Sequence, residues 1–76
     1  MKELLSILEE VKPGIDFNNE KELITDGILD SFDIVTLVSE INDAFDIDFP
    51  VSEIITENFE NIDGLYKTIE KVKENN

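Results

Sequence analysis

The sequence predicts a small all-α domain, a bundle of four helices of which three are longer and one is short. Segments with apolar residues at helical spacing alternate with breaks that contain glycine, asparagine or proline. The chain has 76 residues, so we expect residues 1–76 to form one domain around one core. Its hydrophobic content of 41% is too high for a disordered chain, and without cysteine the fold must depend on helix packing.

The first predicted helix covers roughly residues 2–12. Its apolar face holds Leu4, Leu5, Leu8 and Val11, and Pro13-Gly14 ends it. Residues 13–29 combine turn formers with apolar side chains. We therefore expect a long connection that lies over the core rather than a second regular helix.

The second predicted helix covers residues 31–45 and begins after Asp30, whose side chain can cap it. At about 100° per residue one arc is apolar and contains Ile34, Leu37, Val38, Ile41, Ala44 and Phe45. The opposite side contains Asp33, Thr36, Glu40 and Asp43. Phe32 projects away from the apolar arc, and two interpretations stay open: it packs beneath the preceding connection, or it contacts partner proteins.

Pro50 marks a turn after this helix, and a short third helix is predicted between Val51 and Phe59. Asn61 can cap the last helix, in which Leu65, Ile69 and Val72 form an apolar stripe.

Composition excludes several kinds of chemistry. Without histidine or cysteine, the chain has no Ser–His–Asp triad, no thiol nucleophile and no histidine or thiolate zinc site, so we expect no enzyme activity. Asp43, Asp46 and Asp48 lack the glycine and the bidentate acid of a calcium loop, so we expect no metal site.

Charge indicates the kind of partner. Nineteen acids against six lysines give a net charge of −13, and no basic residue lies between Glu22 and Tyr66. Such a surface repels phosphate backbones and anionic lipids, so we expect basic proteins as partners and no nucleic acid. No apolar segment reaches the roughly 20 residues of a membrane helix, and no signal peptide is recognisable, which predicts no membrane insertion and a cytoplasmic location.

Ser31 is the candidate for modification. At the first turn of a helix its hydroxyl faces solvent near free backbone amides, where a phosphodiester is well tolerated. It has no base to activate it, but a serine that another enzyme modifies needs none. Taken alone, Asp30-Ser31-Phe32 favours plain helix capping.

The stretch from Asp30 to Pro50, DSFDIVTLVSEINDAFDIDFP, resembles the modification helix of acyl carrier proteins and peptidyl carrier domains. That resemblance implies a four-helix bundle of acyl-carrier type, in which Ser31 bears a covalent 4′-phosphopantetheine. Asp30 would help to hold magnesium in the complex with the phosphopantetheinyl transferase. Partners would dock on the same helix, at Phe32, Asp33, Val35, Glu40 and Asp43.

Two short stretches refine the resemblance. Leu29-Asp30-Ser31-Phe32 and Pro50-Val51-Ser52-Glu53 are similar to D-alanyl carrier proteins, whereas Asp33 and Ser39 depart from them. This implies a monomeric carrier that holds D-alanine as a thioester for teichoic acid D-alanylation, served by an adenylating ligase and a D-alanyl- or acyl-transfer enzyme. Two alternatives stay open: an acyl carrier protein for fatty acid or polyketide synthesis, and an unmodified acidic protein-interaction module.

Overall fold

The structure, a computed structural model, describes residues 2–75, and every regular element in that range is helical. The elements are α1 (Lys2–Val11), α2 (Ser31–Phe45), the 3₁₀ turn η1 (Val51–Glu53), α3 (Thr56–Phe59) and α4 (Ile62–Asn75). The predicted all-α class, with three longer helices and one short one, is confirmed.

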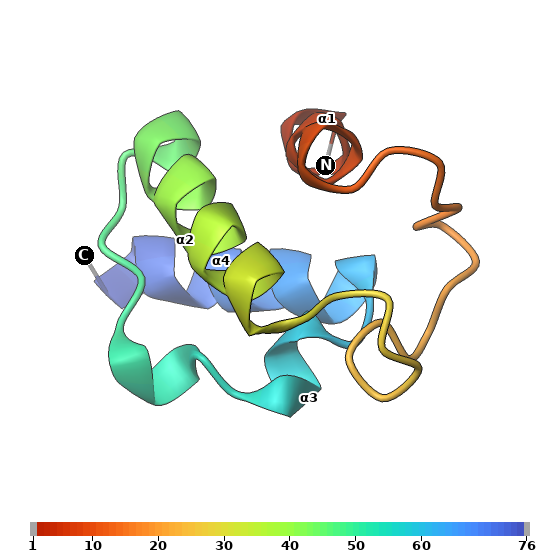
Figure 1. Cartoon of the computed structure of the whole chain (residues 1–76). Coiled ribbons are helices and arrows are strands. Elements are labelled where there is room, and N and C mark those ends of the chain that lie inside the picture. Colours follow the sequence, from red (N-terminus) through yellow and green to blue (C-terminus); the bar gives the residue numbers. More distant parts are fainter. Residues whose placement is uncertain (1, 76) are drawn as a thin grey trace.

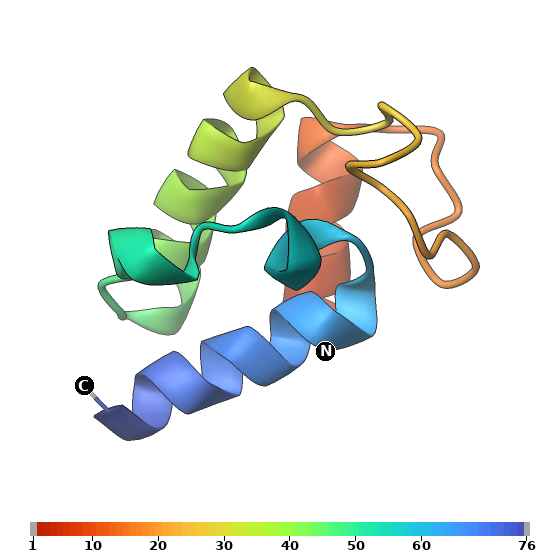
Figure 2. The same cartoon turned by 90° about the horizontal axis from the view of Figure 1, so that it is seen from below.

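Helix α1 packs against both α2 and α4, and α3 packs against α4 (Figure 1). The start of α2 lies beside the end of α1, and η1 and α3 lead the chain back to α4 (Figure 2). The long connection between α1 and α2 occupies one side of the molecule, at the right of both views. This arrangement leaves one side of α2 without a neighbouring helix.

The core draws on all the longer helices and on the connection. Its buried apolar side chains include Leu4 and Leu8 of α1, Leu37 and Ile41 of α2, and Leu65 and Ile69 of α4. Phe17, Leu23 and Leu29 of the connection are also buried. The expectation that the connection lies over the core is therefore confirmed.

The region after α2 differs from the prediction. A single short helix was expected between Val51 and Phe59, but η1 and α3 are separate there because Ile55 is extended, with φ −126° and ψ 154°. Ala44 is exposed rather than buried, because it lies at the edge of the apolar arc of α2.

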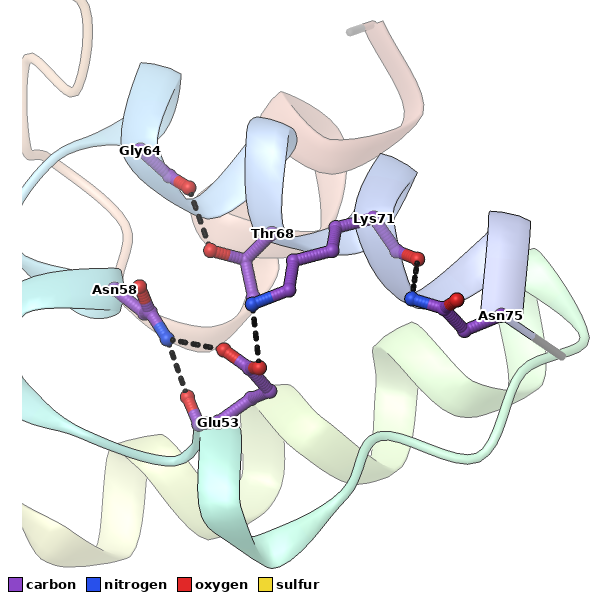
Figure 3. Close-up of polar contacts among 6 residues, drawn as sticks. All are labelled: Glu53, Asn58, Gly64, Thr68, Lys71 and Asn75. Atoms are coloured by element: carbon purple, nitrogen blue, oxygen red, sulfur yellow. Dashed lines mark hydrogen bonds and ion pairs between the residues drawn. The ribbon is translucent and has the colours of Figure 1, made fainter.

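A polar network fixes η1 against α3 and α4 (Figure 3). Lys71 Nζ donates to Glu53 Oε2 at 2.8 Å, and Asn58 Nδ2 donates to the Glu53 carbonyl at 2.7 Å and to its Oε1 at 3.1 Å. The hydrogen bond from Lys71 lowers the pKa of the Glu53 carboxyl. One glutamate therefore joins three elements.

Candidate functional site

Ser31 is the first residue of α2 and is exposed to solvent. The preceding Asp30 caps the helix as predicted: its Oδ1 accepts from the amide of Asp33 at 2.9 Å, and its carbonyl accepts from the amide of Ile34 at 3.0 Å. Asp33 Oδ2 in turn accepts from the amide of Asp30 at 3.1 Å, which completes a capping box. These bonds order the turn that contains Ser31.

An ion pair joins this turn to the end of α1. Lys12 Nζ lies 3.2 Å from Asp33 Oδ2, and the Asp33 side chain is 16% exposed. Burial opposes ionisation of Asp33, but the bonds from the Asp30 amide and from Lys12 outweigh it and lower the pKa of the carboxyl. The helical wheel placed Asp33 opposite the apolar arc of α2, but it did not predict that the side chain is largely covered and paired with Lys12. Its carboxylate bends back towards the helix start and α1.

Glu60 holds the end of the connection that leads to Ser31. Its Oε1 accepts from the amides of Ile24 at 2.8 Å and Thr25 at 2.9 Å, its Oε2 accepts from the Thr25 hydroxyl, and its carbonyl accepts from the amide of Leu23 at 2.8 Å. The bond from the Thr25 hydroxyl is the main cause of the lowered pKa of the Glu60 carboxyl.

No local pattern in the sequence predicts this contact. Its partners are 35 and 36 residues apart, and nothing distinguishes Glu60 from the other acids.

Gly27 ends the turn that Glu60 holds. It adopts φ +73°, a left-handed conformation that glycine reaches without strain. Its amide donates to the Ile24 carbonyl at 3.0 Å, and the amide of Leu29 donates to the Leu23 carbonyl at 2.9 Å. The chain is therefore turned towards α2 immediately before the serine.

An apolar strip with acidic neighbours lies on the open side of α2. Phe32 is 84% exposed and Val35 is 69% exposed, and the acids Glu40 and Asp43 further along the helix are also exposed. The interpretation that Phe32 packs beneath the connection is wrong. Val51 in η1 and Ile55 before α3 are exposed as well. The prediction of one continuous helix in that region did not identify them as exposed.

The geometry around Ser31 fits an attached phosphodiester. An exposed serine hydroxyl at a helix N-terminus fits a phosphodiester, because the amides of Ser31 and Phe32 precede the first intrahelical donor and the helix dipole is positive there. Residues 2–75 contain no group of three or more side chains that could hold a metal ion. Within the same range no helix has the length and apolar character needed to cross a membrane.

Comparison with known proteins agrees with this geometry. The family model described as "Phosphopantetheine attachment site" matches residues 2–69. The chain is 32% identical to the D-alanyl carrier protein of Lactococcus lactis subsp. lactis over 79 aligned residues, which cover all of both chains.

Two further relatives have the same name. The D-alanyl carrier protein of Lactobacillus delbrueckii subsp. bulgaricus is 32% identical, over 96% of this chain and 92% of the relative. That of Bacillus cereus is 30% identical, over 95% and 94% respectively. No solved structure gives a significant match to the chain. Because the family model spans nearly the whole chain, the protein belongs to the phosphopantetheine-attachment family of carrier proteins, whose members bear that group covalently.

Proposed function

We propose that this protein carries D-alanine on a 4′-phosphopantetheine attached to Ser31, as a non-catalytic single-domain carrier for teichoic acid D-alanylation. The observation that carries the proposal is the exposed Ser31 at the capped start of α2, in a chain whose full-length relatives are named D-alanyl carrier proteins. A helix N-terminus that is ordered by a capping box offers a modifying enzyme a hydroxyl in a defined place.

The chain's own residues would present the hydroxyl and leave the chemistry to partners. Ser31 would supply the oxygen that forms a bond to the pantetheine-side phosphorus of coenzyme A, while the pyrophosphate bond breaks and adenosine 3′,5′-bisphosphate leaves. The phosphopantetheinyl transferase would supply the base that takes the serine proton, since this chain has no histidine. Asp30 contributes a carboxylate next to the serine, which would help to hold magnesium in that complex. When attached, the group supplies a terminal thiol on which the cargo is held as a thioester.

The open side of α2 would serve as the docking surface. Phe32 and Val35 offer apolar contact next to Ser31, and Glu40 and Asp43 favour a basic partner. Exposed charge pairs give fast, weak and salt-sensitive binding, which suits a monomeric cytoplasmic carrier that passes between a transferase, an adenylating ligase and a transfer enzyme. Asp33 contributes less to this surface because Lys12 already pairs with it.

The test of the attachment site is intact-mass analysis after incubation with a promiscuous transferase and coenzyme A. The wild type should gain one phosphopantetheine, Ser31→Ala should gain none, and Ser39→Ala should behave as the wild type. Ser39 is a matched control because it is an exposed serine on the same helix. An unmodified wild type, or a modified Ser31→Ala variant, would contradict the proposal.

The cargo is tested on the modified protein. A D-alanine-activating ligase with ATP should load D-alanine, whereas a fatty-acyl ligase should load little. The reverse result would favour a fatty acid or polyketide carrier. Normal function of Ser31→Ala in cells would favour the unmodified acidic interaction module.

A further inference from the structure

The acidic turn at the start of α2 is in contact with a lysine from the end of α1. Lys12 lies directly after α1, and its amide still donates to the Leu8 carbonyl at 2.8 Å, so the residue continues the last turn of that helix. Its ammonium lies 3.2 Å from Asp33 Oδ2, the same oxygen that accepts from the Asp30 amide at 3.1 Å. Ser31 therefore lies between two aspartates in the sequence, of which Asp33 pairs with Lys12 and Asp30 bonds to Asp33.

We propose that Lys12 is a positioning residue for the modification of Ser31, because its ion pair with Asp33 holds the first turn of α2 against the end of α1. The inference rests on the proposed function and deepens it, since it names a residue outside α2 on which presentation of the serine depends. The two helix ends lie side by side at the top of Figure 2.

The pair joins two helix ends, and the Asp33 side chain in it is 16% exposed while that of Lys12 is 39% exposed. Removal of Lys12 takes away both the cation and part of the cover of the carboxylate. The carboxylate would then turn towards water and weaken its bond to the Asp30 amide. Helix ends are among the least stable parts of a protein, so a small loss there changes the ordered fraction.

If Lys12 acted only through electrostatic attraction of partners, its removal would have the opposite effect on modification of Ser31. A lysine beside the modification site reduces the negative field that draws basic enzymes, so its loss should improve encounter. A positioning role therefore predicts poorer modification of Lys12→Met, and a purely electrostatic role predicts unchanged or better modification. The sign of the effect separates the two.

The matched control is Lys71→Met. It removes one positive charge and one ion pair, as Lys12→Met does, but the pair lies between α4 and η1 (Figure 3). Amide hydrogen exchange on the unmodified protein should be faster by about three- to tenfold at Asp30, Asp33 and Ile34 in Lys12→Met. In Lys71→Met faster exchange should instead affect Ile54 and Asn58, whose amides bond within the η1–α3 segment.

Kinetics of modification complete the test. With a transferase and coenzyme A, Lys12→Met should raise the KM for the carrier about two- to fivefold at unchanged kcat, because a smaller fraction has the ordered turn. Lys12→Arg should restore the wild-type KM, and Lys71→Met should not raise it. Any one of three results would overturn the inference. These are a KM for Lys12→Met at or below that of Lys71→Met, exchange at the wild-type rate at the three amides in Lys12→Met, and a Lys12→Arg variant that behaves as Lys12→Met. A wild type that is never modified would refute the proposed function itself.

Discussion

Helices α2 and α4 have nearly the same length, 15 and 14 residues, yet they meet the rest of the molecule in opposite ways. The buried residues of α4 are Ile62, Leu65, Thr68, Ile69 and Val72, whereas those of α2 are Leu37 and Ile41. Helix α2 also exposes Phe32 and Val35. The contrast indicates that α4 contributes more of its length to the core, while α2 leaves Phe32 and Val35 exposed to solvent.

The starts of the two helices are built alike. Asp30 caps α2, and Asn61 Oδ1 accepts from the amide of Gly64 at 2.7 Å at the start of α4, as the sequence predicted. The difference between the helices therefore lies in what their sides contact. Substitutions on the core side of α4 and on the exposed side of α2 should separate effects on stability from effects on modification and partner binding.

The largest effect is expected from the core side of α4. Leu65→Ala removes a fully buried side chain and should lower the free energy of unfolding by about 2 to 5 kcal/mol, which is enough to unfold much of so small a domain. Denaturant unfolding followed by circular dichroism measures it. A loss below about 1 kcal/mol would contradict the view of α4 as the scaffold.

Removal of either helix cap should cause an intermediate loss of stability, similar in size at the two helices. Asp30→Ala and Asn61→Ala each remove a side-chain acceptor for a helix amide and should each lower the free energy of unfolding by about 1 kcal/mol. Asp30→Ala should also slow modification of Ser31, and Asn61→Ala should not. Equal rates of modification in the two variants would mean that order at the start of α2 has no part in presenting the serine.

Acid should act on α2 through Asp33. Because the folded protein lowers the pKa of this carboxyl from 3.8, the stabilisation is present above that pH and is lost as the pH falls through the lowered pKa. Asp33→Asn should therefore narrow the difference in melting temperature between pH 6 and pH 2. Lys12→Met should narrow it too, whereas Asn61→Ala, which leaves Asp33 in place, should retain the wild-type difference.

The smallest effect on stability is expected at Phe32. Since its side chain is 84% exposed, Phe32→Ser should change the free energy of unfolding by less than about 0.5 kcal/mol. It should nevertheless weaken binding to the transferase several-fold, measured by titration calorimetry. A large loss of stability with unchanged binding would assign Phe32 to packing rather than to presentation.

Local features of the sequence were sufficient for much of the fold. Apolar spacing located α1, α2 and α4, and the side chains of Asp30 and Asn61 marked two helix starts, because both signals depend on residues within a turn or two. The split of the third helix at Ile55 was missed, since short segments carry too few apolar residues to define a period.

The candidate site divides in the same way. The sequence by itself determined that Ser31 begins a capped helix in an acidic chain without catalytic histidine or cysteine, and these are matters of order and composition. The tertiary structure decided that Phe32 is exposed, that Asp33 pairs with Lys12, and that Glu60 holds the turn at Thr25. The contacts of Asp33 and Glu60 named here join residues 21 and 35 positions apart, and tertiary packing brings them together in a way that no local pattern encodes.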